Sequence, residues 1–299
     1  MTDRWIVGVD GSPEARHALE WAARQARSHE ARLEAVWTWH LPYSPALGLV
    51  GPSAGSLWSE VGDEVDEQLR ELVAQVSRAE QVQIEPIAVQ GHAAQTLLEA
   101  SLGAGLVVVG NRGRGGFARL MLGSVSQQCA THARVPTAVV PAAAAIGQIG
   151  SVVVGVDGSD NSRCALLWAM RFAPAAADIR AIGAGEPWSF GLEGGYEVTA
   201  RDLARQSEAD FHRVIDEICA QAPESGRPLE RVFEYDTARR VLLDAATDAD
   251  LIVVGARGHG AVGAAILGSV STFVLHRARV ATVVVPRIDR PDSLPRDGS

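Results

Sequence analysis

The sequence predicts an α/β protein in which two similar domains follow one another, each a five-stranded parallel sheet with helices on both faces. Three observations predict this class. The chain repeats itself, with Ser12 matched by Ser159 and Leu106 by Leu251. Within each repeat, strands that are apolar throughout alternate with helices, which is typical of a buried parallel sheet. The 299 residues are enough for two domains of about 150 residues, each with its own core.

The repeat involves separate segments at a nearly constant offset, so the two halves are expected to share one architecture. The matched pairs include 6–12 (IVGVDGS) with 153–159 (VVGVDGS), 106–113 (LVVVGNRG) with 251–258 (LIVVGARG), and 122–126 with 267–271 (both LGSVS). We expect a first domain at 1–143 and a second at 150–288, joined by the short uncharged linker 142–150. The polar, proline-rich tail 289–299 is expected to be disordered.

The first repeat opens with a strand at 4–10 and a helix that runs to about residue 29. Ser12 suits the N-cap of this helix, Pro13 its first position and Glu14 its first turn. The remaining strands of this repeat are expected at 33–38, 83–89, 106–109 and 137–140. A loop at 42–55 and a polar helix at 56–81 separate the first two of these strands. A helix at 93–102 follows the second of them, and a glycine-rich loop at 110–122 and a helix at 123–132 precede the last. The second repeat is expected to have strands at 152–156, 179–184, 231–235, 251–254 and 282–285. Ligands of such sheets bind beyond the carboxyl ends of the strands.

The composition excludes several functions. All 27 basic residues are arginine, so a Walker-type phosphate loop and a Schiff-base mechanism, which need lysine, are excluded. The net charge of −9 argues against a nucleic-acid partner. The N-terminus lacks the pattern of a signal peptide, and no apolar run is long enough to cross a membrane. We therefore expect a cytoplasmic protein without membrane insertion.

The strongest functional signal is the glycine-rich loop after the fourth strand of each repeat. The pattern G-x2-G-x9-G-S occupies residues 110–124 and again 255–269. Glycines let the backbone approach an anion closely, and the Gly-Ser pair opens a helix whose free N–H groups and dipole favour phosphate. Neither 112–155 nor 251–288 contains Asp or Glu. The loops therefore predict a phosphate site, although glycines that only make tight turns would give the same pattern.

Polar side chains at two further places support this hypothesis. Ser126 and Ser271 are expected to add hydroxyl donors one turn into the helix that follows the loop. Asp10 and Asp157 end the first strand of each repeat, where a carboxylate can accept from ribose hydroxyls or help to hold a metal-bound phosphate. The alternative for each aspartate is a local cap of the turn that follows it.

The loop signature, together with a first strand that ends in Asp, resembles the ATP-binding class of the universal stress protein family. The resemblance covers both repeats and is closest to the tandem, two-domain members common in actinobacteria. It implies Rossmann-like, adenine nucleotide alpha hydrolase-like domains that bind ATP, with Mg²⁺ expected on the phosphates. It also implies a regulator or sensor in stress, hypoxia or growth arrest that acts through an unknown protein partner. Pairing along the last strands, between domains or in a homodimer, is a further implication.

The binding residues of the family carry over onto matching positions of both repeats. The resemblance implies nucleoside contacts at Gly8, Val9, Asp10, Thr38, Gly155, Val156, Asp157 and Ala184. It implies phosphate contacts at Val109, Gly110, Arg112, Gly113, Gly123, Ser124, Val125, Ser126, Val254, Gly255, Arg257, Gly258, Gly268, Ser269, Val270 and Ser271. Near the adenine position, Trp37 and Trp39 of the first repeat are replaced by Gly183 and Gly185. We therefore expect the two pockets to differ in affinity.

Three other functions compete with this hypothesis. Residues 258–263 match G-x-G-x-x-G, as in a dinucleotide enzyme, but they follow the fourth strand and no acidic residue lies about twenty positions on. A slow ATPase is the second alternative, although no histidine recurs beside a nucleophile in both repeats and no general base is evident, so a dedicated catalytic activity is not expected. In the third, a scaffold, the nucleotide only stabilises the fold.

Overall fold

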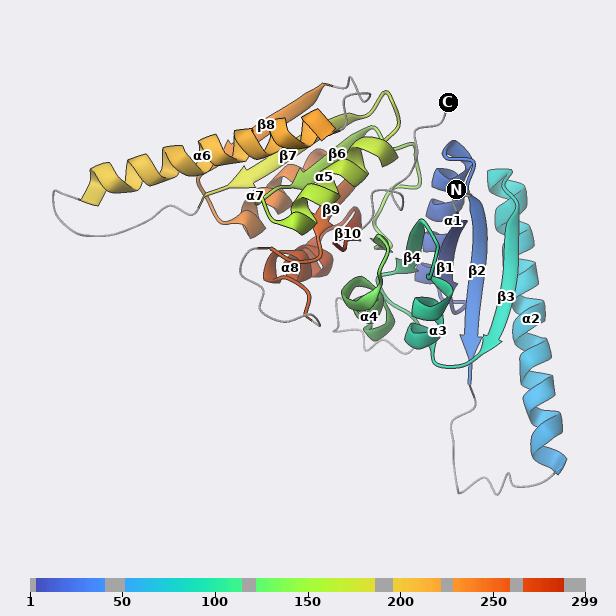
Figure 1. The fold of residues 1–299 in the computed structure, drawn as a ribbon. Helices are drawn as coiled ribbons and strands as arrows, with labels where there is room; N and C mark the ends of the chain where they lie inside the picture. Colours follow the sequence, from blue (N-terminus) through green and yellow to red (C-terminus); the bar gives the residue numbers. More distant parts are fainter. Residues whose placement is uncertain are drawn as a thin grey trace. The chain divides into compact units, whose positions relative to one another are not determined.

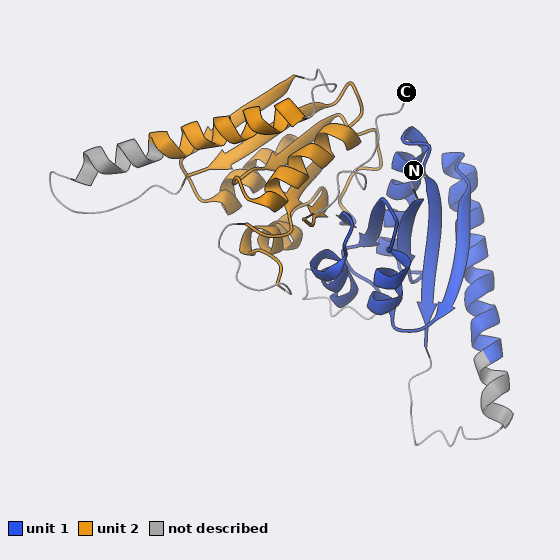
Figure 2. Cartoon of the chain, viewed as in Figure 1, with its two compact units in different colours: residues 1–142 blue, residues 143–299 orange. Residues whose placement is uncertain are grey.

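The computed structural model of the chain describes residues 4–40, 52–114, 122–185, 196–221, 228–258 and 266–287, with the backbone alone at 52–58 and 196–204. Contacts divide the chain into two compact units, residues 1–142 and 143–299 (Figure 2). The predicted tail 289–299, the loop 42–51 and most of both glycine-rich loops lie outside the described residues.

Unit 1 is a parallel sheet with helices on both faces (Figure 1). Its strands are β1 (Arg4–Val9), β2 (Arg32–Trp39), β3 (Ile84–Gln90), β4 (Leu106–Gly110) and β5 (Thr137–Val140), in the order β3-β2-β1-β4-β5. Its helices are α1 (Pro13–Ser28), α2 (Pro52–Glu80), α3 (Ala93–Ala100) and α4 (Ser124–His132). Helices α1 and α2 pack together on one face and α3 and α4 on the other, because right-handed crossovers run in opposite directions from β1.

Unit 2 repeats this plan. Its strands are β6 (Ser151–Gly155), β7 (Asp178–Ala184), β8 (Leu229–Glu234), β9 (Leu251–Gly255) and β10 (Ala281–Val285), in the order β8-β7-β6-β9-β10. Its helices are α5 (Asp160–Phe172), α6 (Tyr196–Gln221), α7 (Ala238–Ala245), the short 3₁₀ helix η3 (Ala246–Asp248) and α8 (Ser269–Arg277). The predicted fold class is therefore confirmed.

The first helix of each unit begins where its sequence predicts, and its apolar face forms part of the core. The Ser12 hydroxyl accepts a hydrogen bond from the backbone N–H of Ala15 at 3.2 Å, and the Ser159 hydroxyl accepts one from Ser162 at 3.3 Å. The indole rings of Trp21 and Trp168 lie at equivalent places and are each only 1% exposed. These caps fix where the turn after the first strand ends.

The predicted element bounds hold to within two residues, with one exception. Helix α2 begins at Pro52, whereas the sequence predicts a loop up to residue 55. Proline is favoured in the first turn of a helix, where its missing N–H has no partner to lose, so 52–55 forms this turn. The interpretation of Gly, Pro and Ser as loop residues was wrong at 52–55, because it did not consider that proline is favoured in the first turn of a helix.

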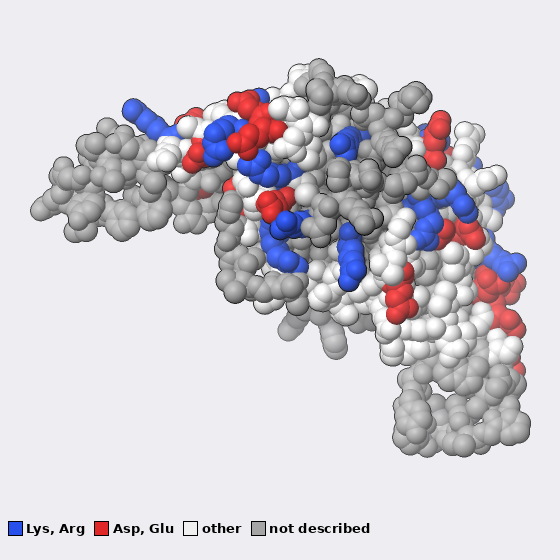
Figure 3. All heavy atoms as spheres, in the orientation of Figure 1, with Lys and Arg blue, Asp and Glu red and all other residues white. Residues whose placement is uncertain are grey.

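Arginine and acidic side chains are intermixed on the face shown in Figure 3. On α6, Arg213 pairs with Asp210 at 3.0 Å and with Glu217 at 2.7 Å, and Arg163 of α5 reaches Glu217 at 2.8 Å. Hydrogen bonds from Arg163 and Arg213 lower the pKa of the Glu217 carboxyl. Because the pairs are exposed, they contribute little to stability.

Candidate functional site

Each unit contains a cavity at the carboxyl ends of its strands. The cavity of unit 1 has a volume of about 540 Å³ and that of unit 2 about 610 Å³. Both volumes fall within the range usual for small-molecule sites. The edge is the one where the strand order reverses between β1 and β4, or β6 and β9, which is where open α/β sheets bind ligands.

Every predicted site residue lines one of these cavities. Around the cavity of unit 1 lie Gly8, Val9, Asp10, Thr38, Val109, Gly110, Arg112, Gly113, Gly123, Ser124, Val125 and Ser126. Around that of unit 2 lie Gly155, Val156, Asp157, Ala184, Val254, Gly255, Arg257, Gly258, Gly268, Ser269, Val270 and Ser271. Segments from the first, second and fourth strands of each unit, far apart in sequence, therefore meet around one space.

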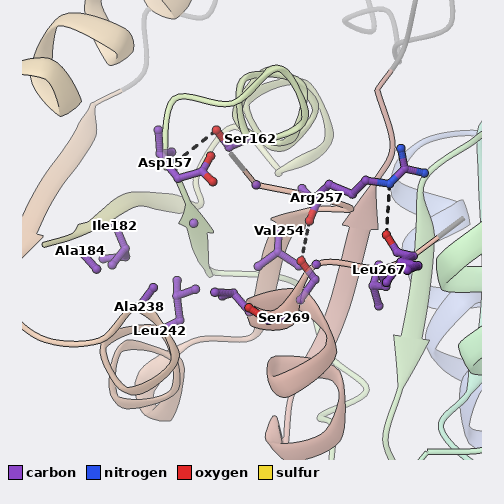
Figure 4. A pocket seen from close by; sticks show the side chains of 18 residues that line it. Asp157, Ser162, Ile182, Ala184, Ala238, Leu242, Val254, Arg257, Leu267 and Ser269 are labelled. Carbon is purple, nitrogen blue, oxygen red and sulfur yellow. Dashed lines mark hydrogen bonds between the residues drawn. The ribbon is translucent and has the colours of Figure 1, made fainter. Parts of the chain in front are cut away.

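Apart from Ala184, the residues of the apolar wall of each cavity were missed by sequence reasoning. In unit 2 it is formed by Ile182, Ala184, Ala238 and Leu242, which lie together opposite Arg257 (Figure 4). Two of these residues lie on α7, which crosses over the sheet, so their place could be known only from the packing of that helix. The one hint of this wall in the sequence was the glycine in the first strand. A Cβ at Gly155 would approach the side chain of Leu242 at 3.2 Å.

The wall of unit 1 is built from equivalent positions. Val36, Ala93 and Leu97 line it, and Ser162 of unit 2 corresponds to Ala15 here. A Cβ at Gly8 would lie 2.7 Å from the side chain of Leu97. A larger residue in the first strand would thus push against a helix of the same unit, whether or not a ligand is bound.

The helices that follow the glycine-rich loops begin without a side-chain cap. Gly123 is the N-cap of α4 and Gly268 the N-cap of α8, and neither helix has an acidic residue in its first turn. The first backbone N–H groups of a helix have no partner within it. These groups, at Ser124 and Val125 and at Ser269 and Val270, line the cavities.

The glycines of the loop in unit 1 differ in whether packing within the protein explains the absence of a side chain. A Cβ at Gly110 would lie 2.9 Å from the carbonyl oxygen of Glu14, and one at Gly113 would collide with the carboxylate of Asp10. At Gly123, by contrast, a Cβ would make only ordinary contacts at 3.5 Å. Packing within the protein therefore explains Gly110 and Gly113, but it does not explain Gly123, which borders the cavity.

Asp10 holds the loop against the first turn of the unit. One oxygen accepts from the backbone N–H and the hydroxyl of Ser12, at 3.0 and 2.6 Å, and the other accepts from the N–H of Arg114 at 2.9 Å. Asp157 makes the same two bonds to Ser159, also at 3.0 and 2.6 Å. The turn-cap alternative for both aspartates thus describes their contacts in this structure, and Asp10 additionally orders the loop.

Two serines do not act as the free hydroxyl donors that the sequence predicted. The hydroxyl of Ser126 donates to the carbonyl oxygen of Gly110, and that of Ser271 to Gly255, each at 2.6 Å and buried. Each proton is therefore already used to tie the helix to the end of the neighbouring strand. The residues line the cavities, but what they can offer a ligand is the backbone N–H.

The arginine of each loop lies between the two glycines of its turn. Arg257 Nε donates to the carbonyl oxygen of Ile266 at 3.2 Å (Figure 4). In unit 1 the Nε of Arg112 and the side-chain oxygen of Asn111 are buried, and neither has a hydrogen-bond partner among the residues that the structure describes. Buried polar groups are normally paired, so this pair marks a place where a polar ligand or water is expected.

This architecture, a parallel sheet with helices on both faces and a cavity at the carboxyl ends of its strands in each of two units, defines a class of tandem α/β proteins. The chain belongs to the universal stress protein family. The family model matches twice, over residues 1–141 and 149–286.

Relatives of known name match over nearly the whole chain. Universal stress protein Rv2005c of Mycobacterium tuberculosis is 32% identical over 285 residues, which is 93% of this chain and 95% of that protein. Universal stress protein Rv1996 of the same organism is 30% identical over 309 residues, covering 97% of this chain and 96% of the relative. The chain is thus similar to mycobacterial members of the family along nearly its full length.

Solved structures share the fold at lower identity. A universal stress protein from Archaeoglobus fulgidus covers 96% of this chain and 99% of its own, with a TM-score of 0.65 and 19% identity. One described as a putative universal stress protein from Pseudomonas aeruginosa covers 96% and 94%, with a TM-score of 0.62 and 16% identity. At these identities the likeness concerns the fold alone.

The described parts of the chain contain neither a membrane-spanning helix nor a cluster of metal-ligating side chains. None of the helices there combines the length and the apolar character needed to cross a bilayer. In the same parts, no group of three or more His, Cys, Asp or Glu side chains is placed to hold a metal ion. Among the described residues that line the cavities, Asp10 is the one carboxylate in unit 1 and Asp157 the one in unit 2.

Proposed function

We propose that each unit binds an adenosine nucleotide, ATP in the first instance, and that the protein acts in the cytoplasm as a nucleotide-dependent regulator of a stress response. The proposal also includes Mg²⁺ carried on the phosphates, a protein partner and a homodimer. Membership of the universal stress protein family supports the link to stress.

The observation that carries the proposal is the pair of uncapped helix N-termini, each bordering a cavity beside a glycine turn. The N-terminus of α4, with its free N–H groups and the positive end of the helix dipole, lines the same cavity as Arg112. The N-terminus of α8 lines the same cavity as Arg257. Such an arrangement stabilises a phosphate by hydrogen bonds and charge together. Its occurrence in both units, at matching residues, supports one ligand class for both.

The remaining part of each cavity suits a base and a sugar. The apolar walls, Val36 and Leu97 in unit 1 and Ile182 and Leu242 in unit 2, offer the flat apolar contact that a purine ring requires. Asp10 and Asp157 line the same cavities as this wall and the glycine turn. Because a carboxylate oxygen can accept more than one hydrogen bond, each aspartate can still accept from a ribose hydroxyl.

Binding without rapid turnover is the version of the proposal that the site favours. The lining carboxylates already accept hydrogen bonds from the turn that they cap, so neither is positioned as a free general base. Helices α4 and α8 begin at Ser124 and Ser269, beyond the segments that match a dinucleotide fingerprint. We therefore rank slow ATP hydrolysis second and a dinucleotide enzyme third.

The test places a negative charge where the phosphate would bind. Ser124→Glu and Ser269→Glu put a carboxylate at the exposed first position of α4 or α8, where an acid stabilises the helix by about 0.3–1 kcal/mol. The fold should thus persist while like-charge repulsion lowers ATP affinity by about a hundredfold or more at the altered unit. The neutral variants Ser124→Gln and Ser269→Gln are the matched controls.

Calorimetry with ATP and mass spectrometry of ligand released from denatured protein give the readout. We expect about two nucleotides per wild-type chain, about one in each single Glu variant and none in the double variant. Equal ATP affinity in the Glu and Gln variants would refute the proposed phosphate site. Release of NAD would favour a dinucleotide enzyme, and steady phosphate release would favour an ATPase.

A further inference from the structure

Two histidines of unit 1 face one another at the rim of its cavity. Strands β2 and β3 are neighbours, and the N–H of Gly91 donates to the carbonyl oxygen of Trp39 at 2.9 Å. The residues that follow, His40 after β2 and His92 at the N-cap of α3, are therefore brought together by the sheet. Their ring centroids lie 5.4 Å apart with an angle of 48° between the planes. His40 also lines the cavity.

Both imidazoles are available to bind something else. The two side chains are exposed, and neither makes a hydrogen bond or ion pair to the described part of the chain. His29, by comparison, uses its Nδ1 on the carbonyl oxygen of Gln25 at 2.8 Å and contacts the ring of Trp5. A pair of free imidazoles is thus a feature of the cavity rim and not of every histidine here.

The spacing of the rings fits coordination of one metal ion. A zinc–nitrogen bond of about 2.0–2.1 Å, with the ring centre about 1.2 Å further on, places two imidazoles of a tetrahedral site about 5 Å apart. The observed 5.4 Å agrees with this value. A base stacked between the rings would need about 7 Å, twice the thickness of an aromatic ring, so the pair is too close to act as an aromatic clamp.

We propose that His40 and His92 bind a single transition-metal ion of the Zn²⁺, Ni²⁺ or Cu²⁺ type at the rim of the unit 1 cavity. Neutral imidazole suits these metals, whereas Mg²⁺ and Ca²⁺ require oxygen ligands, which the pair does not supply. Water completes the coordination shell, since the described residues provide two ligands. The positive end of α3 lies beside His92 and opposes a cation, so the site is weaker than a structural zinc site.

Unit 2 does not repeat this pair. Thr237 is the N-cap of α7 at the place that His92 takes in α3. The expected stoichiometry is therefore one ion per chain, and the second unit supplies a natural model for a variant that removes a ligand. The proposal is independent of the nucleotide, because it concerns residues at the rim and needs no phosphate.

Zn²⁺ titration of the full chain, prepared without a histidine tag and without nucleotide, tests this site. The wild type should bind one Zn²⁺, and His92→Thr and His40→Gln should each lower the affinity by about tenfold or more. His132→Gln is the matched control, because His132 is exposed at the end of α4 and lies outside the pair. Its affinity should equal that of the wild type.

Electron paramagnetic resonance of bound Cu²⁺ provides the second readout. We expect nitrogen couplings from two imidazoles in the wild type and from one in His92→Thr, with unchanged far-ultraviolet circular dichroism in all variants. The proposal is overturned if the wild type shows no saturable Zn²⁺ binding, if His92→Thr binds as tightly as the wild type, or if the Cu²⁺ spectrum shows a single nitrogen.

Discussion

The two units fill the space beside their second strand in different ways. In unit 1 the second strand itself supplies the large side chain, and in unit 2 the neighbouring strand and helix supply it. In unit 1, Trp37 of β2 is 5% exposed and pairs in register with Ala88 of β3. In unit 2, Gly183 takes the place of this tryptophan and pairs with Phe233 of β8. A Cβ at Gly183 would lie 2.6 Å from Phe211 of α6 and 2.7 Å from Phe233. Aromatic rings from a helix and an edge strand therefore occupy the room that one indole occupies in unit 1.

This difference shows which features a duplicated fold keeps. Exchanges that conserve volume are tolerated in a core, so the large residue can move to the partner strand while register and topology stay the same. In unit 1 the exchange reaches the site, since the guanidinium of Arg114 lies 5.3 Å from the centroid of the Trp37 ring. Gly183 offers no ring for such a contact.

The largest effect is expected from removing the indole of unit 1. Trp37→Gly leaves a cavity that Ala88 cannot fill, and it should destabilise unit 1 by about 3–5 kcal/mol. Adding Ala88→Phe, which reproduces the pair of unit 2, should restore part of this loss. Hydrogen exchange measured by mass spectrometry, peptide by peptide, assigns the change to unit 1. If the double variant is no more stable than Trp37→Gly, the two pairs do not fill equivalent space.

The next effect concerns the attachment of the glycine-rich loop. Asp10→Asn keeps one acceptor oxygen but turns an amide NH₂ toward a backbone N–H, so it loses a hydrogen bond to Ser12 or to Arg114. We expect the free energy of unfolding to fall by about 1–3 kcal/mol and the backbone amide hydrogen of Arg114 to exchange faster with solvent.

Arg114→Ala is the matched comparison for the same loop. It keeps the backbone N–H that Asp10 accepts and removes only the contact with Trp37, which should reduce stability by about 0.5–1 kcal/mol. An Arg114→Ala effect larger than that of Asp10→Asn would mean that the side chain, and not the carboxylate, orders the loop.

The sequence predicted what depends on local chemistry or on repetition. The Ser12 cap, its match at Ser159 and the apolar strands follow from residue patterns, and the parallel sheet with helices on both faces follows from the alternation of strands and helices. The glycine-rich loops were located because their spacing occurs twice. Each of these signals lies within a short stretch of chain.

What the sequence did not predict depends on contacts between distant residues. Leu97 and Leu242 line the cavities because α3 and α7 fold over the sheet, and His40 meets His92 because β2 and β3 are neighbours. The hydroxyl of Ser126 was taken for a ligand donor because the nearby Gly110 carbonyl could not be seen in the sequence. Pattern reasoning places a residue on an element, but packing decides what its side chain contacts.

A small effect is also expected where the units differ by one buried side chain of similar size. Cys129 on α4 and Val274 on α8 occupy the same helical position, and both are 0% exposed. Burial raises the pKa of the Cys129 thiol to about 12, so the reactive thiolate is scarce at pH 8 and increases only as the pH approaches that value. Iodoacetamide at pH 8 should therefore label the half-buried Cys164 and Cys219 before Cys129, as measured by peptide mass spectrometry.

Cys129→Val, which copies unit 2, should change stability by less than about 1.5 kcal/mol because it replaces one small apolar group by another. Rapid labelling of Cys129 in the folded protein would show that α4 opens readily, and the equivalence of the two helices would then fail.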